Sequence, residues 1–207
     1  MEDSWLGIAK RLQSIAATGG EFTQDKYDRE RYQEISELAL TMLSNLGRVP
    51  IKTIDGLVGL KARGYDTPKI DVRGAIFRDN QILLVQEESD GLWTLPGGYA
   101  DVGFSAAENV EKEVYEEAGI RVKAQQLFNV RHKAKGDFDP DVRDFYKLYF
   151  ICEILNDQGL SPGTETLDAR FFSKSEIPPL SKGRVIVEDL NMAWDFSTKE
   201  YAPALFD

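Results

Sequence analysis

The sequence is poor in the residues that form covalent or metal cross-links, with one cysteine and one histidine among 207 residues. Cys152 lies in an apolar run and has no second cysteine to pair with, so we predict a buried thiol and neither a disulfide nor a zinc site. His132 has a cation on either side and no neighbour that suggests a catalytic triad. We therefore interpret His132 as a structural or surface residue.

Long hydrophobic runs and an excess of positive charge are also missing. No run approaches the roughly 20 apolar residues of a membrane-spanning helix. A signal peptide is not expected either, because Glu2, Asp3 and Lys10 interrupt the start of the chain. The net charge of −10 disfavours a protein that binds long nucleic acid or an anionic membrane, but it allows a nucleotide whose phosphates are bridged by a metal. We expect a soluble, cytoplasmic protein.

Residues 3–46 carry two apolar patterns at helical spacing. The first predicts a helix that ends at Gly19-Gly20, and the second predicts a helix from about Asp25 to Gly47. A third, shorter helix is predicted after Pro50. The apolar positions are Trp5, Ile8, Ala9, Leu12, Ile15 and Ala16 in the first pattern, and Ile35, Leu38, Ala39, Met42, Leu43 and Leu46 in the second. Such helices need a surface to pack on. We expect that surface to be the second domain or another copy of the chain in a homodimer.

Composition changes from helix-like to strand-like at residues 64–68. We therefore expect a helical N-terminal domain at residues 1–64 and a second domain at residues 65–207. Asp79-Asn80 is a hairpin turn signal between two strand-like runs. The runs that predict strands are 70–77, 81–85, 93–95, 122–132, 144–155 and 168–172, and a closing helix is predicted at 184–194. This pattern predicts an α/β fold, with a mixed sheet and helices on its faces.

The stretch from Trp93 to Ile120 contains a helix with well-marked ends. Ser105 is a good N-cap, Glu108 completes a capping box, and Gly119 suits a left-handed C-cap. One apolar face is predicted to pack on a core, and its members are Ala107, Val110, Val114 and Ala118.

Glu113, Glu116 and Glu117 lie together on a second face of this helix, next to the apolar face. Like charges at this spacing cost about 0.2–0.5 kcal/mol per pair, and the helix dipole disfavours carboxylates in the last turn. A hard divalent cation would remove the repulsion, and Gly97 and Gly98 let the backbone approach a ligand closely. The spacing therefore predicts a loop-and-helix site for Mg²⁺ or Mn²⁺ with a phosphate-bearing substrate. The alternative is a solvated acidic helix after a turn.

The same stretch resembles the Nudix box, G-x5-E-x7-R-E-U-x-E-E-x-G-U, where U is a bulky aliphatic residue. The matching positions are Gly98, Glu113, Val114, Glu116, Glu117, Gly119 and Ile120. Two positions differ, with Phe104 in place of the first Glu and Lys112 in place of the Arg. In the family this Glu and Arg are understood to help hold the loop against the helix, so the differences imply a changed loop support. The resemblance implies a Nudix α/β/α sandwich and an intact enzyme.

The resemblance also implies roles for individual residues. Glu113, Glu116 and Glu117 would be metal ligands, with the backbone carbonyl of Gly97 as a further one. Either Glu116 or Glu117 would also orient or deprotonate the attacking water, and the sequence does not separate the two.

The N-terminal segment resembles the helical extension of hydrolases of X-linked nucleoside diphosphates. This second resemblance implies hydrolysis of the pyrophosphate bond of a nucleoside diphosphate linked to X. The products would be a nucleoside monophosphate and phospho-X, and ADP-ribose and CDP-choline are the expected substrates.

Four residues are candidates for substrate contact: Arg73, Gly98, Arg131 and Glu165. Arg73 lies in an apolar strand that borders the substrate cleft in this type of domain, and its alternative is an outward-facing position. Arg131 could contact phosphates from a strand end, or defend a solvated edge. Glu165 stands where family members often carry an acid outside the box. Four further acids are interpreted as turn or surface residues, with contact to the metal as the alternative: Asp137, Asp139, Asp141 and Asp144.

Three other functions stay open at this point. The first is hydrolysis of nucleoside triphosphates or of RNA 5′ ends. The second is a non-catalytic Nudix module that senses a nucleotide, which the differences at Phe104 and Lys112 keep open. In the third, the main role of the protein belongs to the N-terminal helices, which would form a dimer or bind a partner.

Overall fold

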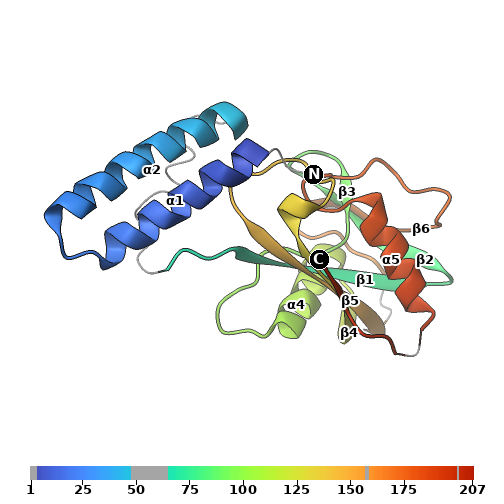
Figure 1. Cartoon of the computed structure of the whole chain (residues 1–207). Coiled ribbons are helices and arrows are strands. Elements are labelled where there is room, and N and C mark those ends of the chain that lie inside the picture. Colours follow the sequence, from blue (N-terminus) through green and yellow to red (C-terminus); the bar gives the residue numbers. More distant parts are fainter. Residues whose placement is uncertain (1–3, 48–64, 157–158, 200) are drawn as a thin grey trace. The chain divides into compact units, whose positions relative to one another are not determined.

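The computed structural model describes residues 4–47, 65–156, 159–199 and 201–207, which form two compact units. The first unit contains the described residues up to Lys69 together with Ala134–Phe145, and the second contains Ile70–Lys133 and Tyr146–Asp207. Figure 1 shows the helices of the first unit in blue. The third helix predicted after Pro50 falls outside the described residues. No helix in these ranges has the length and apolar character that a bilayer crossing requires.

Helices α1 (Ser4–Phe22) and α2 (Lys26–Gly47) form a helical hairpin (Figure 1). Asp25 caps the second helix, because its Oδ1 accepts hydrogen bonds from the backbone N–H groups of Tyr27 and Asp28 at 2.8 and 3.0 Å. The first unit has a small apolar core of its own, made of Leu6, Ala9, Leu40, Leu43 and Val142.

The predicted end of the first helix at Gly19-Gly20 is wrong, because α1 continues to Phe22. A Cβ atom at Gly19 would lie 2.4 Å from ring atoms of Tyr32 on α2. The glycine therefore allows the second helix to approach closely, and here that tertiary contact outweighs its tendency to break a helix.

The predicted apolar faces of the two helices are only partly correct. The buried residues are Leu6, Ala9, Gln13 and Ala16 on α1, and Ser36, Ala39, Leu40 and Leu43 on α2. Ile8 and Ile15 are 45% and 42% exposed, and Leu38 is 61% exposed. Small side chains fill much of the buried faces, and Ser36 Oγ donates a hydrogen bond to Gln13 Oε1 there at 3.0 Å. The helices therefore pack through three leucines and several small residues, and they leave other large apolar side chains outside.

The second unit is built on a mixed sheet of seven strands. They are β1 (Lys69–Arg78), β2 (Gln81–Glu87), β3 (Trp93–Thr94), β4 (Arg121–His132), β5 (Phe145–Asn156), β6 (Thr166–Phe172) and β7 (Leu205–Phe206), and a 3-10 turn, η1 (Lys133–Lys135), follows β4. Their order is β3-β2-β1-β5-β4-β7, and β6 pairs with β2. The β4–β5 pair is antiparallel and the β4–β7 pair is parallel, which makes the sheet mixed as predicted.

The hairpin between β1 and β2 turns at Asp79 and Asn80, as predicted. Both residues have positive φ, 49° and 61°. Consecutive positive φ values are those of a type I′ turn, which matches the twist of the two strands that it joins. The turn sets the register, in which Phe77 pairs with Ile82.

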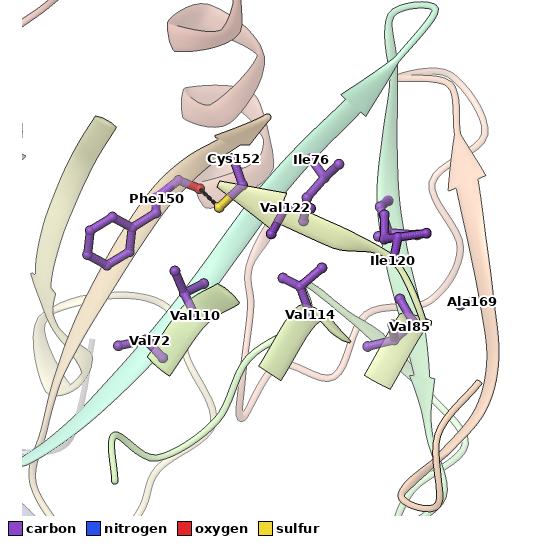
Figure 2. Packing of buried hydrophobic residues seen from close by; sticks show 12 residues of the cluster. Val72, Ile76, Val85, Val110, Val114, Ile120, Val122, Phe150, Cys152 and Ala169 are labelled. Carbon is purple, nitrogen blue, oxygen red and sulfur yellow. Dashed lines mark hydrogen bonds between the residues drawn. The ribbon is translucent and has the colours of Figure 1, made fainter. Parts of the chain in front are cut away.

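Helices α4 (Ala106–Ala118) and α5 (Val187–Ser197) cover opposite faces of the sheet. Figure 2 shows Val110 of α4 beside Val72 of β1, and Val114 of the same helix belongs to the same apolar cluster. The same cluster contains Cys152, which is buried as predicted. On the other face, the buried apolar residues of α5 are Leu190, Ala193, Trp194 and Phe196. The predicted α/β/α sandwich is confirmed.

The closing helix begins at Val187, three residues later than predicted. Before it, the chain makes a turn in which the N–H of Val185 donates to the carbonyl of Ser181 at 2.9 Å. Arg184 lies in this turn and forms an ion pair with Glu87 of β2, at 3.0 Å. The helix begins after a local cap, in which Asp189 Oδ2 accepts a hydrogen bond from the N–H of Ile186 at 3.1 Å.

Candidate active site

Helix α4 has the ends that its sequence predicts. Ser105 Oγ accepts a hydrogen bond from the N–H of Glu108 at 3.2 Å, and Glu108 Oε2 accepts one from the N–H of Ser105 at 2.8 Å. At the other end Gly119 has a φ of 74°, and its N–H donates to the carbonyl of Tyr115. Both ends are therefore stabilised locally, so the acidic face of the helix has a defined position.

The glycine loop before α4 is fastened to strand β1 through the backbone. The N–H groups of Val72 and Gly74 donate to the carbonyls of Gly98 and Pro96, at 2.8 and 2.9 Å. Gly97 lies between these bonds with a φ of 142°, and a Cβ there would come within 2.0 Å of the carbonyl oxygen of Val72. Position 97 therefore requires glycine, both for its backbone angle and for the close approach.

Glu117 joins the acidic face of α4 to this loop. Its Oε2 accepts a hydrogen bond from the N–H of Gly97 at 2.9 Å, and the residue is only 8% exposed. Burial raises the pKa of Glu117 to about 8, although the charge of Arg73 and the Gly97 N–H both act to lower it. In the absence of a metal ion, burial therefore favours the protonated form of this carboxyl.

The other two glutamates of the box have different surroundings. Glu113 lies against the loop, because a Cβ at Gly98 would be 3.1 Å from its Oε2. Burial also raises the pKa of Glu113. Glu116 is more exposed, and its Oε2 accepts a hydrogen bond from Lys112 Nζ at 2.9 Å.

The family resemblance implies a divalent cation, and the chemistry of the donors suits one. Carboxylate and carbonyl oxygens are the ligands that Mg²⁺ prefers, and a cation could replace the proton that burial favours on Glu117. Within the described ranges, however, no group of three Asp, Glu, His or Cys side chains is arranged to hold an ion. Glu113 and Glu117 both face the loop, whereas Glu116 would first have to leave Lys112.

Arg73 is buried, and its observed contacts are those of a residue that supports the loop. Its Nε and Nη2 donate to both carboxylate oxygens of Asp71, at 2.9 and 2.8 Å, and its Nη1 donates to the carbonyl of Leu95 at 3.1 Å. Burial by itself would raise the pKa of Asp71, but the charges of Arg73 and Lys147 lower it to about 2. Contact between Arg73 and the substrate stays a prediction.

The remaining candidates lie at separate places. Arg131 is within 3.6 Å of Glu188 and of Asp189 on α5. The carbonyl of Glu165 accepts a hydrogen bond from the N–H of Glu88. The next residue, Thr166, donates from its Oγ1 to the carbonyl of Glu117 at 2.9 Å, so the chain around Glu165 is fastened to the last turn of α4. The four aspartates at 137, 139, 141 and 144 belong to the first unit.

The structure adds two residues that the sequence interpretation missed. Glu87 is buried at the end of β2, where burial raises its pKa and Arg184 pairs with it. The sequence did carry a signal for Glu87. It follows Leu83 and Val85 at every second position of the strand, which places its carboxylate on the face that packs against α4. The second residue is Asn109, buried on α4 and bonded to the loop. It stands beside the apolar Val110, and nothing in its spacing marked it.

Comparison with known proteins identifies the class to which this site belongs. A model of the NUDIX domain matches residues 68–190, and a model of the UDP-X-like, N-terminal oligomerisation domain matches residues 3–58. The chain belongs to the Nudix family and is a pyrophosphohydrolase.

One relative and two solved structures are similar to this chain over much or all of its length. A putative ADP-ribose pyrophosphatase of Bacillus subtilis is 41% identical over 207 residues, which cover 100% of this chain and 99% of the relative. The crystal structure of an ADP-ribose pyrophosphatase from Streptococcus suis is 42% identical, with a TM-score of 0.62 over 68% of this chain and 100% of the other. The crystal structure of a UDP-X diphosphatase is 30% identical, with a TM-score of 0.63 over 98% of both chains.

Proposed function

We propose that this protein hydrolyses the pyrophosphate bond of a nucleoside diphosphate linked to X, with ADP-ribose as the first substrate to test. The products are a nucleoside monophosphate and phospho-X. The observation that carries the proposal is the contact of buried Glu117 with Gly97, which joins an acidic helix to a glycine loop. The names of the B. subtilis and S. suis relatives favour ADP-ribose, and the UDP-X diphosphatase favours the wider class.

A divalent cation, Mg²⁺ or Mn²⁺, is part of the proposal. Glu113 and Glu117 would hold it, with the Gly97 carbonyl and, once released from Lys112, Glu116. When bound, such a cation neutralises charge on phosphate oxygens and lowers the pKa of water. The chain itself fixes the geometry around that position, because Arg73 and strand β1 fasten both sides of the loop. Glu116 or Glu117 orients the water or takes its proton.

We also propose that residues 1–64 and 65–207 act as separate domains and that the first one forms a homodimer. The two family matches leave a gap between residues 58 and 68, which supports a boundary near residue 64. The match to an oligomerisation domain and the exposed apolar residues of α1 and α2 support the homodimer.

The test of the proposed function is a panel of ADP-ribose, CDP-choline, a UDP-linked sugar, a nucleoside triphosphate and a short RNA with a 5′ triphosphate. Each is incubated with the full chain and Mg²⁺ or Mn²⁺, and the products are identified by phosphorus NMR. We expect a nucleoside monophosphate and phospho-X from at least one X-linked diphosphate. Cleavage of only the triphosphate or the RNA would contradict the proposal. Binding of one member with none cleaved would support the nucleotide sensor instead.

A further inference from the structure

The loop from Pro96 to Ser105 lacks the side-chain support that the family pattern places at positions 104 and 112. Phe104 is half exposed and carries no charge that could pair with α4. Lys112 instead contacts Asp101, three residues earlier in the loop, with its Nζ 3.1 Å from Asp101 Oδ2. Its other contact is Glu116 Oε2, at 2.9 Å. One ammonium therefore links the loop to a glutamate of the box.

Asn109 makes a second and more extensive connection to the same loop. Its Oδ1 accepts a hydrogen bond from the N–H of Asp101 at 2.8 Å. Its Nδ2 lies 3.1 Å from the carbonyl of Ser105, and 3.4 Å from those of Asp101 and Phe104. The residue is 1% exposed, so neither end of its amide has water as an alternative partner.

Burial decides which of the two connections matters more. The side chains of Lys112 and Asp101 are 33% and 56% exposed, and an ion pair in solvent contributes little because water and salt screen it. The amide of Asn109 is buried and makes several bonds to the loop at once, so water competes less for them than for the exposed ion pair. Asn109 is therefore the stronger of the two supports.

These contacts hold the loop at the end opposite to the glycines. Backbone bonds to β1 and the contact between Gly97 and Glu117 fix the first part of the loop. Asn109 fixes the last part, one helical turn before Glu113 on α4. If that end were released, the glycines would no longer be held from both sides against Glu113 and Glu117.

We propose that Asn109 is the main positioning residue of the glycine loop, and that the Asp101–Lys112 pair assists it in place of the family's Glu–Arg pair. Neither acts on the reacting atoms directly, since both work by holding the loop against α4. The inference rests on the proposed hydrolase function for its kinetic effects, but the order of the loop can be measured without any substrate.

The first experiment compares the wild-type chain with Asn109→Ala and Asp101→Asn. Misplacing a reacting group by about 1 Å can cost on the order of a hundredfold in rate. We therefore expect Asn109→Ala to lower kcat about 10- to 100-fold, with KM changed less than about threefold. Asp101→Asn, at the surface, should fold normally and lower kcat by only about threefold, since exposed pairs are weak. The matched control is Glu111→Gln on the same helix, which breaks an ion pair with Lys123 of β4 and should leave kcat unchanged.

The second experiment measures backbone amide hydrogen exchange of the loop peptide in the same proteins without substrate. Faster exchange at residues 98–105 in Asn109→Ala, but not in Glu111→Gln, is the expected result. If the wild type cleaves its substrate while Asn109→Ala and Asp101→Asn both keep its kcat and its exchange rates, the positioning role is wrong. If no member of the panel is cleaved and exchange still accelerates, the proposed function fails and the loop support stands.

The third experiment is a rescue that a general structural role would not predict. Phe104→Glu with Lys112→Arg restores the family pair, and it is introduced into the Asp101→Asn protein. We expect kcat and the loop exchange rates to return to wild-type values. A rescued exchange rate without rescued kcat, or no rescue of either, would overturn the view that the Asp101–Lys112 pair replaces the family pair.

Discussion

Helix α4 and the α1–α2 hairpin each keep a locally unfavourable feature, and the two features differ in kind. On α4, three glutamates crowd one face, and two of them are drawn toward a glycine loop. On the hairpin, Ile8, Ile15 and Leu38 are exposed although they are apolar. Departures of this type mark places where a chain is shaped by something besides its own stability. The charge on α4 suits a cation, and the apolar surface of the hairpin suits a second protein surface.

The largest expected effect comes from removing the charge on α4. We expect Glu117→Gln to lower kcat by about 10²–10⁴-fold, the range lost with a general acid or base. The same change should raise the melting temperature at pH 8 without metal, because the amide oxygen still accepts from Gly97 while the buried charge is gone. Kinetics and thermal unfolding measure the two effects, with Glu111→Gln as control. A variant as active as the wild type would mean that the crowded carboxylates serve no catalytic purpose.

The next-largest effect is expected from a substitution in the glycine loop. Gly97→Ala should lower both activity and stability, because the added Cβ would meet the carbonyl of Val72 at 2.0 Å in a backbone region that favours glycine. We expect a loss of about 1–3 kcal/mol in the free energy of unfolding, measured in urea. Gly103→Ala is the control, because it also has a positive φ, 94°, but open space around it. Equal losses in both variants would assign the effect to φ alone.

The exposed apolar surface of the hairpin gives the third prediction. We expect Ile8→Ser with Ile15→Ser to raise the dissociation constant of the homodimer at least about 100-fold, since burying one such side chain contributes about 1.5–3 kcal/mol. Analytical ultracentrifugation measures the association. Unfolding of the monomer should change little, because both residues are already partly exposed in one chain.

The control for the hairpin is Arg11→Ser, at an exposed polar position of the same helix. An undisturbed dimer in the double variant would show that the interface lies elsewhere. A wild-type chain that stays monomeric at micromolar concentration would contradict the homodimer itself.

The smallest effect is a pH dependence of stability that belongs to α4. The pKa of Glu117 is about 8 in the folded chain, against an ordinary value of 4.5, so the folded state binds the proton more tightly. The resulting stabilisation is complete below about pH 4.5 and is lost as the pH rises toward 8. We expect the melting temperature without metal to fall over that window. Glu117→Gln should flatten the slope, and saturating Mg²⁺ should reverse it if the cation replaces the proton.

Much of this organisation follows from local sequence signals. The capping box of α4, its C-cap glycine and the turn at Asp79 and Asn80 depend on neighbouring residues, and each is present as predicted. Within the described residues the predicted order of strands and helices also holds, except that the last strand, β7, was not predicted. The predicted end of α1 failed where a residue distant in sequence outweighs local preference, because Gly19 continues the helix with Tyr32 packed against it. The predicted start of α5 was three residues early, because the local cap between Ile186 and Asp189 was not recognised in the sequence.

The chemistry of the site divides in the same way. The box positions of Glu113, Glu116 and Glu117 are plain in the sequence, because the spacing of a helix places them on one face. The different environments of the three glutamates cannot be seen in the sequence, since burial and hydrogen bonding arise only when the loop, β1 and α4 come together. Packing of the whole unit raises the pKa of Glu117, pairs Glu116 with Lys112, and turns the amide of Asn109 onto the loop. Periodicity along one chain identifies which side chains are neighbours on a helix, but the loss of water around each of them depends on the complete fold.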